Sequence, residues 1–322
     1  MTGPGAGMYI VIAEFMDEPA VASLRSRFET HYDSSLAERR SELLAVLGDA
    51  DALIVRNRAR VDGEMLAAAG KLKVVGRLGV GLDNIDLPGC EARGIRVIPA
   101  SGANALAVAE YVICAAMILL RGAYLSTAAV ASGEWPRTPL SQGREIAAKT
   151  LGIVGFGSIG RLTAKLARAL DMTVIGFDPQ IPATASSWAE HETVPNRLDD
   201  LLRSADVVSL HVPLTPATHH LIDAAKLALM KRDAVLINTA RGGVVAEVAL
   251  AGALRAGKLG GAALDVFEDE PLRAGSPLSG CPNLLLTPHV AGVTRESNQR
   301  VSALIAESVA AALDEWQGPA SG

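Results

Sequence analysis

A length of 322 residues with 49% apolar residues is enough for two hydrophobic cores, because chains longer than about 250 residues usually divide into domains. The formal net charge of −5 gives no overall basic field, which argues against nucleic acid or an anionic membrane as the main partner. The three cysteines are far apart and form no CxxC pair, so neither a disulfide framework nor a metal site is expected, and a reducing, cytoplasmic location fits best.

The first hundred residues alternate short apolar runs with amphipathic segments. We expect strands at residues 9–13, 30–32, 52–55, 74–76 and 97–98, with helices at 18–27, 36–47 and 62–69 between them. Such an alternation predicts a small parallel sheet flanked by helices.

A mostly apolar segment, residues 103–120, follows these elements and is expected to form a buried helix. It contains Glu110 and is shorter than the roughly 20 apolar residues that span a membrane, so no membrane-spanning segment is predicted. Residues 121–149 are richer in polar residues, glycine and proline, and we interpret them as an arm that reaches over a partner subunit. The apolar helix and the arm together predict a homodimer, because large apolar surfaces are seldom left in water.

The most informative stretch lies in the middle of the chain. An apolar run at residues 151–154 has the length of a buried strand, and residues 158–170 have helical periodicity. Between them, Gly155, Gly157 and Gly160 form a GxGxxG motif. The first glycine of this motif permits a tight turn, the second lets a pyrophosphate approach the backbone, and the third lets the helix pack closely on the strand. We therefore predict dinucleotide binding at this turn.

The next predicted strand, residues 173–177, ends at Asp178. A carboxylate at this position can accept hydrogen bonds from the adenosine ribose hydroxyls. The same carboxylate would repel the 2′-phosphate of NADP, and no arginine occurs at positions 179–187 to offset the repulsion. The pattern therefore favours NAD.

The alternation of strands and helices continues through the second half. We expect strands at 206–210, 234–238, 261–265 and 283–286, and helices at 198–203, 223–230, 246–256 and 293–316. Ligands of such sheets bind outside the carboxyl ends of the strands, so the residues that follow these strands should surround the cofactor.

Three polar side chains, Arg241, Glu270 and His289, follow predicted strands in this half. Arg241 can hold a substrate carboxylate with its planar guanidinium group. His289 can supply a proton as hydride reaches a carbonyl carbon, and Glu270 can orient the imidazole and favour its protonated form. Each residue alone also fits a structural role, but together they indicate hydride transfer to a 2-keto acid.

Five ordered motifs make the chain resemble the D-isomer-specific 2-hydroxyacid dehydrogenases: LGVGLDNID, GFGSIG, NTARGG, AALDVFEDEP and TPHVAG. The resemblance extends over residues 9–316, and the chain looks most similar to the phosphoglycerate dehydrogenase branch without its C-terminal regulatory domain. It implies an α/β fold of two Rossmann-like domains. The NAD-binding domain, residues 104–292, would be inserted in a flavodoxin-like substrate domain formed by residues 1–103 and 293–322.

The resemblance also implies roles for individual residues at the substrate. Arg241 corresponds to the family's substrate-binding arginine, and Glu270 with His289 to its acid–base pair. Backbone amides at Val80 and Gly81 are expected to meet the substrate carboxylate.

On the cofactor side, Ser158 and Ile159 match the pyrophosphate loop, Thr239 and Ala240 the nicotinamide wall, and Asp265 the partner of the carboxamide. The full set of residues expected at NAD comprises Val80, Val108, Gly155, Gly157, Ser158, Ile159, Gly160, Asp178, Val212, Thr239, Ala240, Arg241, Asp265, His289 and Gly292. No metal is expected.

One departure from the family pattern bears on the substrate. After the strand at residues 52–55 the chain reads Arg56-Asn57-Arg58, where the phosphoglycerate branch often has an arginine followed by serine. Two arginines around an amide predict a second anionic group on the substrate, such as a phosphate, sulfonate or carboxylate. The alternative is a pair of solvated surface arginines.

The leading prediction is an NAD-dependent oxidoreductase that interconverts a small (R)-2-hydroxy acid, 3-phosphoglycerate-like or sulfolactate-like, and its 2-keto acid. A glyoxylate or hydroxypyruvate reductase of the same family is an alternative. An NAD(H)-sensing, corepressor-like regulator is an alternative of another class, because some relatives use the fold as a transcriptional corepressor. A formate dehydrogenase is disfavoured, because that branch pairs its histidine with glutamine and this chain has Glu270.

Overall fold

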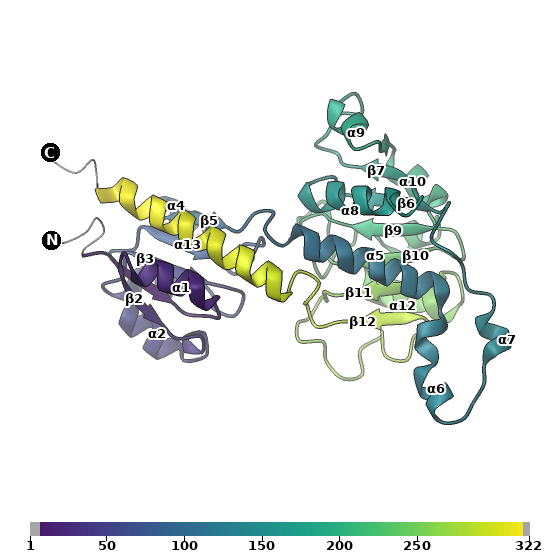
Figure 1. Cartoon of the computed structure of the whole chain (residues 1–322), viewed down its shortest axis with the longest axis horizontal. Helices are drawn as coiled ribbons and strands as arrows, with labels where there is room; N and C mark the ends of the chain where they lie inside the picture. Colours follow the sequence, from purple (N-terminus) through teal and green to yellow (C-terminus); the bar gives the residue numbers. More distant parts are fainter. Residues whose placement is uncertain (1–6, 318–322) are drawn as a thin grey trace. The chain divides into compact units, whose positions relative to one another are not determined.

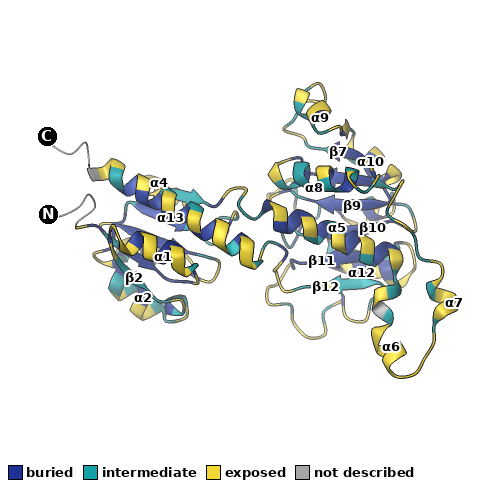
Figure 2. Cartoon of the chain, in the orientation of Figure 1, coloured by how far each residue is buried: buried dark blue, intermediate teal, exposed yellow. Residues whose placement is uncertain are grey.

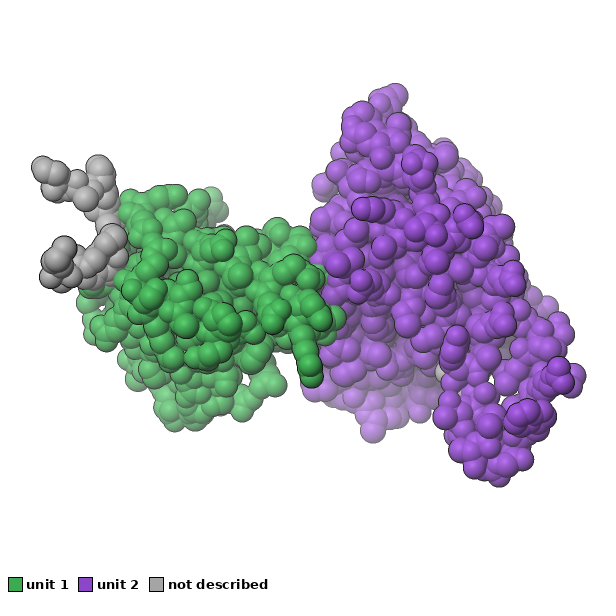
Figure 3. All heavy atoms as spheres, viewed as in Figure 1, with its two compact units in different colours: residues 1–104, 293–322 green, residues 105–292 purple. Residues whose placement is uncertain are grey.

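The computed structural model describes residues 7–317, so the predicted domain limits at residues 1 and 322 lie outside the described residues. The chain divides into two compact units, residues 1–104 with 293–322 and residues 105–292 (Figure 3). Each unit has helices on a parallel sheet of its own (Figure 1). The predicted α/β class with two parallel-sheet domains is confirmed.

The first unit contains a five-stranded sheet in the order β2-β1-β3-β4-β5, in which all neighbours are parallel. Its strands are β1 (Tyr9–Ile12), β2 (Glu29–Tyr32), β3 (Ala52–Val55), β4 (Val74–Arg77) and β5 (Arg96–Pro99). Its helices are α1 (Glu18–Arg25), η1 (Leu36–Glu38), α2 (Arg40–Leu47), α3 (Gly63–Ala68), α4 (Leu87–Ala92) and α13 (Arg295–Gln317). This strand order is that of flavodoxin-like folds.

Successive side chains of the buried strands point to opposite faces of this sheet. Ile10 lies in a core with residues of α1 and α13, whereas its neighbour Val11 lies in a core with residues of α2 and α3. The alternation accounts for the buried middle layer in Figure 2. A side chain at Gly76 would lie 2.7 Å from Val309, so this glycine allows α13 to pack closely on β4.

The second unit contains a seven-stranded parallel sheet in the order β12-β11-β10-β9-β6-β7-β8. Its strands are β6 (Thr150–Val154), β7 (Thr173–Phe177), β8 (Val194–Pro195), β9 (Val207–Leu210), β10 (Val235–Asn238), β11 (Gly261–Leu264) and β12 (Leu284–Leu286). Its helices are α5 (Ala105–Arg121), η2 (Ala123–Ser126), α6 (Thr127–Ala131), α7 (Arg137–Leu140), α8 (Ser158–Arg168), α9 (Ser186–Glu190), α10 (Leu198–Ser204), α11 (Ala224–Leu227) and α12 (Glu247–Arg255).

The strand order of this second sheet is that of a dinucleotide-binding Rossmann fold with one more strand at the β12 edge. The chain adds β7 and β8 on one side of β6, and then β9 to β12 on the other. The order therefore reverses between β6 and β9, and ligands of such sheets bind at this reversal, beyond the carboxyl ends of the strands. The GxGxxG turn follows β6 directly.

Several elements differ from the sequence-based expectation. The helix expected at residues 36–47 is interrupted at Arg39, whose backbone angles (φ −116°, ψ 69°) are not helical. Helix α4 was not expected from the sequence. Its Pro88 is tolerated in the first turn, and Asp86 caps the helix by accepting a hydrogen bond from Gly89 N–H. Helix α9 and strand β8 were also not expected, and both are short.

No helix in the described part of the chain is both long and apolar enough to cross a membrane. Across residues 7–317, no group of three or more His, Cys, Asp or Glu side chains is arranged to hold a metal ion. The three cysteines are free thiols.

Candidate active site

The glycine turn between β6 and α8 has the geometry that its motif predicts. Gly155 has φ +94°, and a Cβ atom there would lie 2.5 Å from the carbonyl oxygen of His211. A Cβ on Gly160 would lie 2.3 Å from the carbonyl oxygen of Gly155. By contrast, no atom lies within 4 Å of the Cβ position of Gly157. The turn is thus tight at its first and third glycines and open at its second, where a pyrophosphate would approach.

Helix α8 begins at Ser158, directly after this open position, and has no acidic residue in its first turn. The first amides of a helix lack intrahelical partners and lie at the positive end of the helix dipole. Both features favour an anion such as pyrophosphate. The positions of Ser158 and Ile159 therefore suit the contacts predicted for them.

Asp178 follows β7 and connects that strand to the glycine turn. Its Oδ2 accepts a hydrogen bond from Phe156 N–H at 2.8 Å, and its Oδ1 accepts one from Gln180 N–H at 2.9 Å. The remaining lone pairs of the carboxylate can accept hydrogen bonds from ribose hydroxyls. The residue thus has a structural function in addition to the one predicted from the sequence.

A cavity of ≈ 680 Å³ is lined by Asp178 and by residues that the sequence analysis did not assign to a site, among them Trp188, Asn196 and Arg197. Its volume is in the range of small-molecule and cofactor sites. Trp188 stacks on Phe156 of the glycine turn, with ring centroids 4.4 Å apart. Arg197 brings a basic side chain to this cavity from outside the window 179–187, and a local sequence pattern could not reveal it.

Arg241 follows β10 in a turn that Asn238 holds in place. The buried Asn238 side chain donates a hydrogen bond to the carbonyl of Arg241 (2.9 Å) and accepts one from Ala240 N–H (3.0 Å). The hydroxyl oxygen of Thr239 in this turn is buried and has no hydrogen-bond partner within residues 7–317. An unsatisfied buried hydroxyl is costly, and a bound nicotinamide group would satisfy it. With the open position at Gly157, this atom indicates that the residues present fit NAD.

His289 and Glu270 are paired. His289 Nδ1 lies 2.8 Å from Glu270 Oε2, while Glu270 Oε1 accepts a hydrogen bond from Phe267 N–H at 3.1 Å. His289 has φ +56°, a left-handed conformation that is uncommon for a residue other than glycine and is often found at functional sites. Because the carboxylate binds Nδ1, Nε2 is the imidazole atom that remains to exchange a proton with a substrate.

Asp265 fixes the turn that carries His289. Its Oδ1 accepts hydrogen bonds from the Thr287 hydroxyl (2.6 Å) and Val290 N–H (2.8 Å), and its Oδ2 accepts one from Ala291 N–H (2.8 Å). The carboxyl group is buried, so these bonds offset its desolvation. The predicted contact of Asp265 with the nicotinamide carboxamide stays a prediction, and the bonds observed are those that position His289.

Another histidine near the cofactor candidates, His211, is a poor candidate for the proton donor. Burial lowers the pKa of His211 to about 4, and its Nε2 lies 2.9 Å from the Ser209 hydroxyl. It is therefore neutral at physiological pH, and the Ser209 hydroxyl orients its ring. The apolar candidates Val108, Val212 and Ala240 are also buried in this unit, whose last residue is Gly292.

The residues predicted at the substrate belong partly to the first unit. Arg56, Asn57 and Arg58 follow β3, whereas the partly exposed Val80 and Gly81 follow its neighbour β4. The side chain of Asn84 joins the two segments by donating hydrogen bonds to the carbonyls of Arg56 (3.3 Å) and Ala59 (2.7 Å). The structure therefore brings the two predicted segments together, and the residue that links them, Asn84, was not singled out from the sequence.

Comparisons with known proteins agree with this geometry. Residues 113–291 match the family model described as "D-isomer specific 2-hydroxyacid dehydrogenase, NAD binding domain". The chain is 53% identical to (S)-sulfolactate dehydrogenase of Chromohalobacter salexigens over 94% of its own length and 98% of that protein. It is 39% identical to D-3-phosphoglycerate dehydrogenase of Methanocaldococcus jannaschii over 93% of its length, but spans 56% of that relative.

A solved structure, D-lactate dehydrogenase from Aquifex aeolicus complexed with NAD and lactic acid, superposes with a TM-score of 0.80 at 28% identity, covering 96% of this chain and 97% of that one. The predicted family and NAD cofactor are confirmed. This chain belongs to the D-isomer specific 2-hydroxyacid dehydrogenase family and is an NAD-dependent oxidoreductase that acts on CH–OH groups.

Proposed function

We propose that the protein interconverts a small, doubly anionic 2-hydroxy acid of the sulfolactate or phosphoglycerate type and its 2-keto acid. The observation that carries the proposed chemistry is the 2.8 Å pair of His289 and Glu270. Bound NADH would supply the hydride to C2 of the keto acid. Arg241 holds the substrate carboxylate, and His289 Nε2 gives a proton to the carbonyl oxygen while Glu270 stabilises the imidazolium form.

The handedness of the product follows from family membership, and its descriptor depends on the distal group. In a D-hydroxy acid such as lactate or glycerate, the carboxyl carbon outranks the neighbouring carbon, which gives the (R) descriptor predicted from the sequence. A sulfonate changes the order, because sulfur outranks oxygen, and the same spatial arrangement is then named (S). The (S)-sulfolactate named for the Chromohalobacter salexigens relative therefore has the hand expected here.

The distal anion is assigned to the loop after β3. Arg56 and Arg58 flank Asn57 at the carboxyl end of a strand, where ligands of parallel sheets bind. The name of the 53% identical relative points to a sulfonate, while the phosphoglycerate dehydrogenases point to a phosphate. We favour the sulfonate because of the higher identity and fuller coverage.

NADH consumption over paired 2-keto acids tests this proposal. Sulfopyruvate should exceed pyruvate in kcat/KM by roughly 10- to 10²-fold, because a charge-assisted contact with a distal anion contributes about 1.5–3 kcal/mol. Phosphohydroxypyruvate and hydroxypyruvate form the second pair. Equal kcat/KM within both pairs, or a preference for glyoxylate, would contradict the doubly anionic substrate. No turnover of any 2-keto acid would favour a regulatory, NAD-sensing role.

We further propose a cytoplasmic homodimer. Most apolar side chains of α5 are already buried within its own unit, so the arm, residues 121–149, gives the stronger support. Tyr124 and Trp135 of this arm are 65% and 78% exposed. Light scattering should give the mass of a dimer at micromolar concentration, and Trp135→Glu should weaken it. A monomeric wild type would contradict this proposal.

A further inference from the structure

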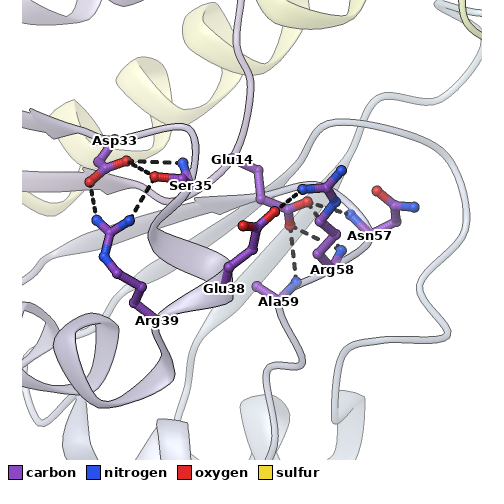
Figure 4. A network of polar contacts seen from close by, with 8 residues as sticks. All are labelled: Glu14, Asp33, Ser35, Glu38, Arg39, Asn57, Arg58 and Ala59. Atoms are coloured by element: carbon purple, nitrogen blue, oxygen red, sulfur yellow. Dashed lines mark hydrogen bonds and ion pairs between the residues drawn. The ribbon is translucent and has the colours of Figure 1, made fainter.

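A buried carboxylate lies directly under the arginine loop, which we define as residues 56–59. Glu14 follows β1 and is 3% exposed. Its carboxylate accepts hydrogen bonds from four successive backbone amides, as Figure 4 shows for the last three. Arg56 N–H donates to Oε1 at 2.7 Å, Asn57 N–H to Oε2 at 3.2 Å, Arg58 N–H to both oxygens at 3.3 and 3.1 Å, and Ala59 N–H to Oε1 at 3.1 Å.

This arrangement fixes the curvature of the arginine loop. Successive amides that converge on one anion form a nest, and hydrogen bonds to a charged acceptor are stronger than neutral ones. A buried carboxylate without such bonds would be destabilised by the loss of water, so the loop and Glu14 hold each other in place. Because these amides already have an acceptor, the loop can recognise a substrate anion through its side chains alone.

The carbonyl side of the arginine loop is held as well. Asn84 donates to the carbonyls of Arg56 and Ala59, at the two ends of the loop. Glu14 and Asn84 therefore hold opposite polar groups of the same four residues. The backbone is fixed before any ligand binds, which lowers the entropic cost of binding.

The two arginines of the loop differ in their partners. Arg58 forms an ion pair with Glu38 of η1, and both side chains are more than half exposed. Arg56 is less exposed and donates from Nη2 to the amide oxygen of Asn298 at 2.8 Å. Arg58 already has a carboxylate at its side, whereas the side-chain partner of Arg56 is a neutral amide. The negative charge near Arg56 is that of Glu14, which the loop amides already stabilise. A ligand anion therefore gains more binding free energy from a contact with Arg56 than from one with Arg58.

We infer that Glu14 is a positioning residue for substrate selection, which holds the arginine loop so that Arg56 presents its guanidinium to the distal anion. This inference rests on the proposed doubly anionic substrate. Glu14 acts through the loop and does not contact the substrate, so its loss should affect substrates with a distal anion and leave the hydride transfer itself unchanged.

The variant Glu14→Gln keeps the size of the side chain but places an NH₂ group among N–H donors. The ratio of kcat/KM for sulfopyruvate to that for pyruvate should fall by about tenfold or more, mainly through KM for sulfopyruvate. Pyruvate reduction should stay within about twofold of wild type. Glu14→Asp keeps the charge and should restore part of the ratio, because a shorter carboxylate can still reach some of the amides.

Asp51→Asn is the matched control. Asp51 is a buried carboxyl of the same unit that accepts hydrogen bonds from Tyr9 N–H and Lys73 Nζ and makes none with the arginine loop. The Asp51→Asn variant should be less stable than wild type, but its ratio of kcat/KM for sulfopyruvate to that for pyruvate should be unchanged. If Asp51→Asn lowers the ratio as much as Glu14→Gln, general destabilisation is the cause and the inference is wrong.

The outcomes separate this inference from the proposed function. A wild-type ratio near one overturns the proposed substrate class and the inference with it. A high wild-type ratio that Glu14→Gln leaves intact overturns the inference alone. If Glu14→Gln does not fold, Glu14→Asp decides, because an unchanged ratio in that variant also contradicts a positioning role.

Discussion

Replacing His289 with alanine should lower kcat for 2-keto acid reduction by roughly 10²- to 10⁴-fold and leave NADH affinity nearly unchanged. The imidazole is the group that we assign to proton transfer, and its Nδ1 is already bound to Glu270 at 2.8 Å. Steady-state kinetics with a fluorescence titration of NADH separates the two effects. Near-normal turnover of the variant would mean that another residue or water supplies the proton.

The left-handed backbone of His289 calls for a second variant, because alanine at φ +56° also strains the turn. His289→Asn provides it, since asparagine tolerates this conformation. Both variants should lose activity to a similar extent. Restored activity in His289→Asn would assign the loss to the backbone. Glu270→Gln removes the negative charge at His289 Nδ1, so kcat for keto-acid reduction should fall, because the imidazole is held less well for proton transfer.

Arg241→Lys should raise KM for the 2-keto acid by about tenfold or more and also lower kcat, because an ammonium group cannot reproduce the two-pronged contact of guanidinium with a carboxylate. The matched control is Arg232→Lys, an exposed arginine of the same unit whose Nε donates to the carbonyl of Gly257 at 2.9 Å. It should change neither constant. A KM unaffected by Arg241→Lys would assign the substrate carboxylate to another group.

Much of the fold could be predicted, because buried strands and helices leave a regular pattern of apolar residues in the sequence. Strands β3 and β7 occur at the residues expected, because buried parallel strands are short runs of apolar residues bounded by turns. Strand β8 has two residues, one of which is proline, and gives no such signal. The break at Arg39 coincides with bonds of its guanidinium to Asp33, Ser35 and Glu42 around the start of α2, local polar contacts that apolar periodicity does not encode.

The residues of the candidate site also divide into those that could be predicted from the sequence and those that could not. Motif residues such as Gly155 and His289 could be assigned because their spacing along the chain encodes a local turn or a strand end. Glu14 and Asn84 could not, because each acts through contacts with residues 56–59, which are far away in sequence. Arg197 could not either, because only the folded cavity brings it together with Asp178. A buried glutamate after a strand has no local pattern, and its role appears only when residues 56–59 fold around it.

Transfer of deuterium from C4-labelled NADH to sulfopyruvate tests the central claim most directly. Direct hydride transfer predicts sulfolactate that carries the label at C2 and is the (S) enantiomer, detected by mass spectrometry after chiral separation. His289→Ala should lower the rate of labelling without changing its position. Unlabelled product would contradict direct hydride transfer, and labelled (R)-sulfolactate would contradict transfer to the face that gives the D-type product.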